Sequence, residues 1–105
     1  MGLLKEWGLS ESAITKCCGT GLVVDIKGTA PACADDGKPR VMAIRADMDA
    51  LPMTEHNTDL EYKTTTPYAH MCGHDGHMAM LLAAAQLFCL QRDKIPANKT
   101  VRLLF

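Results

Sequence analysis

Side chains that bind transition metals are concentrated in one short stretch of this 105-residue chain. The stretch reads His70-Met71-Cys72-Gly73-His74-Asp75-Gly76-His77, and one other histidine, His56, occurs elsewhere. Cys72 and His74 are one residue apart, so a bent loop can direct a thiolate and an imidazole at one ion, and this pair suits zinc and similar divalent metals. A lone Cys-x-His pair is more simply a buried cysteine beside a surface histidine. The concentration of donors instead favours a metal site with Cys72 and His74 as ligands.

Two neighbours of this pair can support it. Asp75 can accept a hydrogen bond from a ligand imidazole and so fix its tautomer. His77 follows His74 by three residues and lies on the same side of the chain if a helix has begun by then. Gly73 and Gly76 allow the unusual backbone angles that a tight chelating loop requires.

A second group of candidates, Asp47 and Asp49, follows the short apolar run 41–44. If the chain stays extended there, the two carboxylates face the same way, and Arg45 can pair with either of them. Such a carboxylate could bind the metal directly or orient a metal-bound imidazole. The commoner use of Asp-x-Asp after a strand is to form a turn or cap a helix. The nearby metal-binding stretch favours the functional interpretation.

The elements that would position these residues are predicted from apolar patterning. We expect a short helix within 3–14 and strands at 21–27, 40–46 and 100–105, with a polar loop at 28–38 between the first two strands. A second helix is expected over 75–91, with Asp75 as its N-cap. The run 41–44 suits a strand buried on both faces, and the long helix is apolar nearly all round, which predicts that it is buried. The last two strands and the long helix form a parallel βαβ unit of a doubly wound α/β fold. Ligands bind at the carboxyl ends of such strands, where both candidate groups fall.

Composition narrows the function classes. The apolar content of 48% indicates a folded core, and the net charge of -1 without a basic run gives no support for nucleic-acid binding. No apolar stretch is long enough to cross a membrane, and no signal peptide is evident, so we expect a cytoplasmic protein. Five cysteines, an odd number, argue against a disulfide framework. The chain ends within an apolar strand, which favours a segment of a longer domain.

Two motifs carry a family resemblance. The segment from Ile44 to Pro52, followed by the segment from His70 to His77, closely resembles the aminoacylase-type metallopeptidase family. Within that family it is most similar to the hydrolases of N-acyl amino acids and auxin–amino acid conjugates. The order and spacing of residues 19–21 and 100–105 match as well, so the resemblance covers nearly the whole chain.

The resemblance implies part of a three-layer, zinc-peptidase-like α/β catalytic domain with a mostly parallel sheet. Residues 1–105 would belong to that domain, incomplete at both ends, and the dimerisation domain of a homodimeric full-length enzyme would lie outside them. It also implies a small-molecule N-acyl amino acid substrate, whose amide bond is cleaved by water activated at two divalent ions, zinc or manganese. In the family pattern Cys72 and His74 bind metal, and His70 and His77, with Asp75, either support these ligands from behind or are possible ligands themselves. Either Asp47 or Asp49 is the catalytic aspartate.

The family continues its last strand into a Gln-Pro-Ala-Glu-Glu segment that supplies the general base and a metal ligand, and residues 1–105 do not contain it. The isolated chain is therefore expected to be inactive, because general-base catalysis contributes about 10²–10⁴-fold to the rate. Two alternatives remain open from sequence. The chain could be a small metal-binding module that uses Cys72, His74 and either His70 or His77 for storage or structure, or an interaction fragment that pairs its sheet with a full-length partner.

Overall fold

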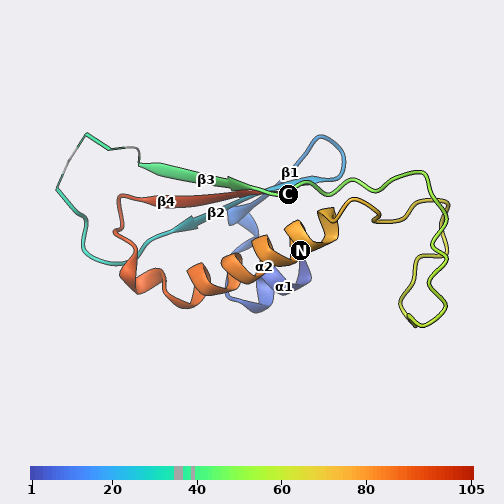
Figure 1. Cartoon of the computed structure of the whole chain (residues 1–105). Helices are drawn as coiled ribbons and strands as arrows, with labels where there is room; N and C mark the ends of the chain where they lie inside the picture. Colours follow the sequence, from blue (N-terminus) through green and yellow to red (C-terminus); the bar gives the residue numbers. More distant parts are fainter. Residues whose placement is uncertain (35–36, 39) are drawn as a thin grey trace.

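The computed structural model describes residues 1–34, 37–38 and 40–105, which form one mixed sheet with helices against it (Figure 1). The elements in chain order are helix α1 (Gly2–Glu6), 3-10 helix η1 (Glu11–Ala13), strands β1 (Ile14–Cys17), β2 (Gly21–Lys27) and β3 (Val41–Arg45), helix α2 (His74–Leu90), 3-10 helix η2 (Arg92–Lys94) and strand β4 (Thr100–Leu104). Asp35 and Asp36 of the loop predicted at 28–38 lie outside the described residues.

The strand order is β1-β2-β4-β3. β3 and β4 are parallel, with Ile44 opposite Leu103, and α2 connects them, so the predicted βαβ unit is confirmed. β1–β2 and β2–β4 are antiparallel, and the expectation of a mostly parallel sheet is therefore wrong for these four strands. A three-residue turn joins β1 to β2, and a parallel pair would need a much longer crossover.

The N-terminal segment differs from the helix expected within 3–14. α1 stops at Glu6, and Gly8 takes a positive φ of 84° that ends the helical path. β1 then begins at Ile14, within the segment predicted to be helical. Only Ile14 is buried in this four-residue strand, so it lacks the alternating apolar pattern by which an edge strand is recognised.

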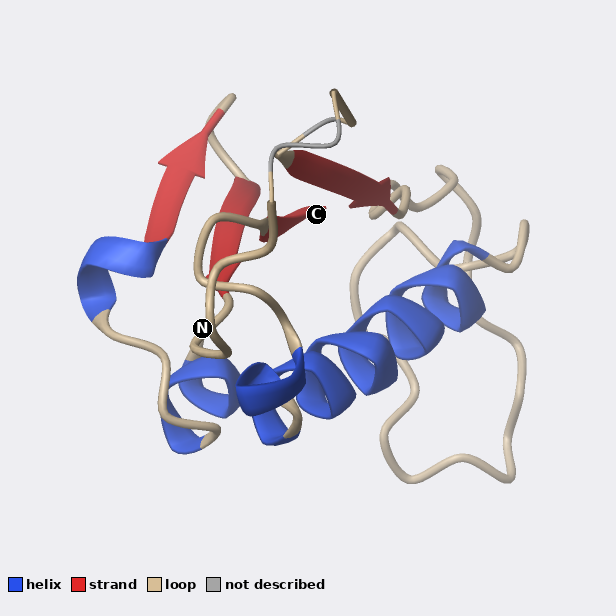
Figure 2. Cartoon of the chain, turned by 90° about the vertical axis from the view of Figure 1, so that its left-hand side faces the viewer, coloured by secondary structure: helices blue, strands red, loops and turns tan. Residues whose placement is uncertain are grey.

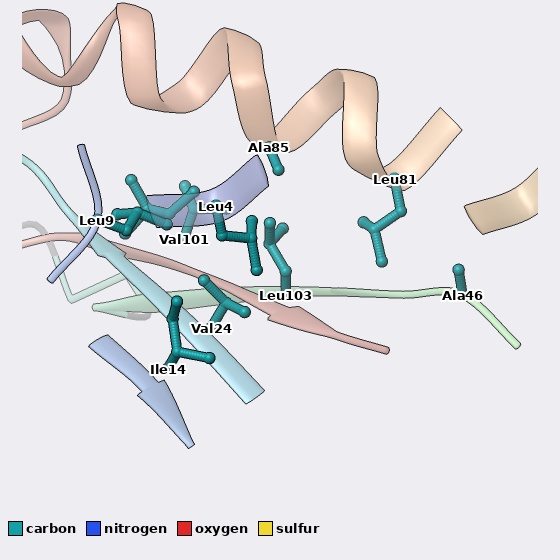
Figure 3. Packing of buried hydrophobic residues seen from close by; sticks show 10 residues of the cluster. Leu4, Leu9, Ile14, Val24, Ala46, Leu81, Ala85, Val101 and Leu103 are labelled. Atoms are coloured by element: carbon teal, nitrogen blue, oxygen red, sulfur yellow. The ribbon is translucent and has the colours of Figure 1, made fainter. Parts of the chain in front are cut away.

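The hydrophobic core lies between the sheet and the two helices, both of which cover the same face (Figures 2 and 3). Leu4, Val24, Ile26 and Leu103 are its largest fully buried side chains. Leu81 and Ala85 of α2 pack against them from above the sheet in the view of Figure 3. The described residues thus supply two layers, and a third layer on the opposite face of the sheet stays a prediction.

Burial was overestimated for α2 and for β3. In α2 only Leu81 and Ala85 are buried, whereas Met80 is 64% and Leu90 74% exposed. β3 is an edge strand, and Met42 on it is 53% exposed. Both α2 and β3 are apolar enough to be packed against other segments on two sides, but the described residues cover each of them on one side only. No described helix is long and apolar enough to cross a membrane.

The connection between β3 and α2 extends away from the sheet and returns (Figure 1, green to yellow). Its two arms are joined by an isolated antiparallel bridge, in which the amides of Leu51 and Ala69 each donate to the other residue's carbonyl at 3.0 Å. Ala69 is buried, with 2% of its surface exposed. The bridge holds the segment after β3 beside the segment before α2, which are the two segments that carry the candidate functional residues.

An ion pair stands on the sheet face opposite the helices. Because Val24 and Ile26 point into the core, Asp25 between them points to the other face. Arg102 lies opposite Asp25 on β4 and donates from Nε and Nη2 to the two carboxylate oxygens, each at 2.7 Å. This hydrogen bonding lowers the pKa of Asp25, with partial burial acting in the opposite direction.

We expect Arg102→Gln to lower the free energy of unfolding only modestly near neutral pH, because both partners are partly exposed and solvent screens the pair. Since the pKa of Asp25 is lower in the folded chain, the pair stabilises above the ordinary carboxyl pKa of 3.8 and loses its effect as the pH falls through the folded value. Urea unfolding over the acid range measures this. Lys5→Gln, which breaks an exposed pair with Glu11, is the control with little expected effect. A loss of stability in Arg102→Gln that is equal at every pH would contradict the assignment.

Candidate metal centre

Three donor side chains come together where β3 ends and α2 begins. The ligand atoms of Asp47, His74 and His77 all lie within 4.8 Å of one another, and they form the one group of this kind among the described residues. The rings of the two histidines are stacked with their centroids 5.7 Å apart. One carboxylate and two imidazoles form a donor set that suits zinc and other first-row divalent ions.

The backbone explains why these side chains meet. Ala46 continues the pairing of β3, since its amide donates to Leu104 at 3.0 Å, and its buried side chain fixes the strand end from which Asp47 emerges. Gly73 precedes α2 with a φ of 86°, a conformation that other residues rarely adopt. The helix begins at His74, one residue earlier than predicted, and Gly73 rather than Asp75 is its N-cap. His77 then lies one helical turn after His74 on the same face.

Asp49 is positioned to orient His74. Nδ1 of His74 lies 2.8 Å from Oδ1 of Asp49, and with the proton on Nδ1 the ring donates to this carboxylate. The other ring nitrogen, Nε2, is then the one able to bind an ion. The side chain of His74 is only 20% exposed, whereas that of Asp49 is 69% exposed. The sequence suggested Asp75 as the hydrogen-bond acceptor for a ligand imidazole. In the structure Asp49 has this role toward His74.

The second carboxylate has a different partner. Nη2 of Arg45 lies 2.5 Å from Oδ1 of Asp47, so the expectation that Arg45 pairs with one of the two aspartates is confirmed for Asp47. Arg45 is mostly exposed, so solvent screens this ion pair. In an extended chain, side chains two residues apart point the same way, so Asp47 and Asp49 reach the same site. Asp47 belongs to the donor group, and Asp49 contacts His74 from behind.

The remaining candidates lie outside the donor group. Cys72 is an exposed free thiol just before Gly73. His70 and Asp75 line a pocket of about 430 Å³ formed largely by the 50–70 connection. His77, for which the sequence left open a supporting role or a ligand's role, is part of the group itself. The His74-x-x-His77 spacing is the signal that could have assigned it, because residues three apart on a helix share a face.

The donor set at a parallel strand end, next to the first turn of the crossover helix, is that of an α/β metalloprotein. Residues 43–105 match peptidase family M20/M25/M40. The chain belongs to this family, and the resemblance to aminoacylase-type metallopeptidases is confirmed.

Three related proteins illustrate the similarity. An N-acyl-L-amino acid amidohydrolase of Geobacillus stearothermophilus is 54% identical over 67 residues, which are 63% of this chain and 17% of that protein. The IAA-amino acid hydrolase ILR1-like 2 of Arabidopsis thaliana is 44% identical over 66% of this chain and 15% of its own. A crystal structure of a dinuclear metal-binding peptidase of the M20 family from Bacillus subtilis superimposes with a TM-score of 0.74 at 33% identity, covering 99% of this chain and 26% of that one. The chain thus spans about a quarter or less of each.

Proposed function

We propose that this chain supplies one side of the metal centre of a metal-dependent amidohydrolase. The whole enzyme would cleave the amide bond of small N-acyl amino acids, auxin–amino acid conjugates among them. The observation that carries the proposal is the group of Asp47, His74 and His77 at the strand end of an M20-family chain. The 54% identity to an N-acyl-L-amino acid amidohydrolase supports the substrate class.

The centre would hold two divalent ions, zinc or manganese. Asp47, His74 and His77 present donors for one of them. Cys72 adds a thiolate if the loop before Gly73 turns inward, which the absence of a side chain at position 73 makes easy. When bound, the ions supply Lewis-acid polarisation of the amide carbonyl and acidify water.

The chain's own residues then have separable tasks. Asp49 holds the His74 ring in the orientation and tautomer that leave Nε2 free. Asp47 serves as a donor, and Arg45 balances its charge through their ion pair. His70 and Asp75 share the wall of a pocket formed largely by the 50–70 connection, and we assign them contacts with substrate there. Residues 1–105 would form part of one catalytic domain, completed by further chain that includes a dimerisation domain.

A side-by-side assay tests the proposal. The full-length enzyme that contains this segment is expected to bind manganese or zinc and to hydrolyse N-acetyl amino acids in a way that a chelator abolishes. The 105-residue segment alone is expected to show no hydrolysis, because the described donor group contains no glutamate to act as general base. Metal uptake by both proteins without hydrolysis by either would favour the metal-binding module. Activity that survives exhaustive chelation would refute the proposal.

Replacing the thiol tests the role assigned to Cys72. We expect Cys72→Ser in the full-length enzyme to lower bound metal about 10-fold or more, because an alcohol is a poorer ligand than a thiolate for these ions. Elemental analysis after dialysis measures the effect. Cys18→Ser removes another exposed thiol, from the turn between β1 and β2, and is the matched control. Unchanged metal content in Cys72→Ser would remove Cys72 from the ligand set and leave the Asp47 group as the whole contribution of this chain.

A further inference from the structure

Two adjacent thiols lie apart from the metal centre and have no role in the proposed function. Cys17 ends β1 and is half-buried, and Cys18 begins the turn to β2 and is exposed. Both are free. Because β2 starts at the carboxyl end of β4, this turn lies at the same end of the sheet as Asp47. Three strand spacings separate β1 from β3, which is about 14 Å.

The hairpin fixes the conformation of this pair. Cys17 is held in register opposite Gly21. Cys18 has a positive φ of 49°, and its carbonyl accepts a hydrogen bond from the amide of Thr20 at 3.0 Å. A Cβ at position 21 would lie 3.0 Å from the carbonyl oxygen of Cys17 and 3.1 Å both from its sulfur and from the carbonyl oxygen of Phe105, so the backbone packs closely here and only glycine fits without a shift. The hairpin thus holds a half-buried and an exposed thiol at adjacent positions.

The geometry argues against a direct bond between the sulfurs. Adjacent Cα atoms are about 3.8 Å apart, whereas disulfides usually join Cα atoms about 4.4–6.8 Å apart. A single soft atom that forms longer bonds to sulfur can bridge the two thiols with less distortion. Burial, and then the charge and hydrogen bonding of Cys18, raise the pKa of the Cys17 thiol. A ligand that carries its own proton acceptor is therefore better suited to this pair than a bare cation.

We propose that Cys17 and Cys18 form a two-thiol site for a trivalent arsenical, which binds as one bridging ligand. With an organoarsenic oxide, two sulfur–arsenic bonds form and the arsenic–oxygen bond breaks. The two thiol protons leave with the oxygen as one water molecule, and arsenic stays trivalent, so no oxidant is required. The site is independent of the hydrolytic function.

The test uses phenylarsine oxide and the full 105-residue chain, with intact mass and peptide mapping as readouts. We expect one phenylarsenic group per chain, bridging Cys17 and Cys18, stable to excess monothiol and removed by a dithiol. Cys17→Ser and Cys18→Ser are each expected to lower retention about 100-fold, because the second bond of a chelate forms at high effective concentration. Cys33→Ser and Cys89→Ser are matched controls and should retain the adduct. Equal retention in Cys18→Ser, or an adduct mapped to Cys72, would overturn the proposal.

A second comparison separates a folded site from mere adjacency in the sequence. If the turn orders the sulfurs, the folded chain should retain the arsenical against dithiol competition about tenfold better than the same chain in urea. Equal retention in native buffer and in urea would show that the turn contributes nothing, and the site as proposed would fall.

Discussion

His74→Ala in the full-length enzyme is expected to lower kcat/KM by more than about 100-fold and to reduce metal content in parallel. Loss of a residue that only supports a ligand already costs about 10–100-fold, and loss of the ligand itself should cost more. His74 is also the residue that joins the two halves of the site, since it belongs to the donor group and contacts Asp49. Kinetics with an N-acetyl amino acid and elemental analysis of the same preparation measure both effects.

The matched control for this substitution is His56→Ala. His56 is exposed in the connection between β3 and α2 and lies outside the donor group, so its loss should leave both metal content and kcat/KM nearly unchanged. Circular dichroism of both variants separates loss of metal from loss of fold. Full metal content and full activity in His74→Ala would mean that the group of Asp47, His74 and His77 is not the centre.

Asp49→Asn is expected to lower metal affinity about 10–100-fold while the donor group keeps its composition. The amide has nearly the shape of the carboxylate, but it lacks the charge that favours the proton on Nδ1 of His74. The ring can then turn, or adopt the tautomer in which Nε2 carries the proton and cannot bind an ion. Titration with zinc or manganese at fixed pH gives the change in dissociation constant.

Asp59→Asn provides the control, because Asp59 is exposed and hydrogen-bonds locally with Thr58 and Asn57. Asp49→Glu adds a second test, since it restores the charge at a different reach and should recover part of the affinity. An Asp49→Asn variant with unchanged affinity but greatly reduced turnover would move Asp49 from positioning His74 to contact with the reacting groups. This comparison separates the two roles that the family resemblance leaves open for Asp47 and Asp49.

Local patterns predicted the βαβ unit well. The apolar run 41–44 and the long apolar segment after residue 74 are strong signals, and α2 begins and ends within one residue of its expected bounds. Local patterns could not predict that β2 runs antiparallel to β4, or that β1 exists. Strand direction depends on where a connection returns, and β1 is a short edge strand with one buried side chain. The burial of α2 and β3 was overestimated because an apolar face shows only that a segment can be buried. Whether it is buried depends on which other segments cover it.

The candidate site was predicted in its members more than in its arrangement. The concentration of donors in 70–77 and the paired aspartates contain all three members of the donor group, but Cys72, predicted as a ligand, lies outside it. The contact between His74 and Asp49 joins residues 25 positions apart, which spacing alone cannot predict. The place of His77 in the donor group depended on α2 starting at His74. These details follow from tertiary geometry, above all from the parallel pairing of β3 with β4 and from the backbone bridge at Leu51 and Ala69.

The backbone bridge between Leu51 and Ala69 also makes residues 52–68 a closed loop, an excursion from the sheet whose two ends are held side by side. Loop closure becomes only slightly more costly as a loop lengthens, by about 0.6 kcal/mol for each doubling. The excursion can therefore vary in length and sequence over evolutionary time without displacing Asp47 or His74. Residues of this segment line much of the pocket that also includes His70 and Asp75, so changes confined to residues 52–68 would reshape that pocket and leave the donor group in place.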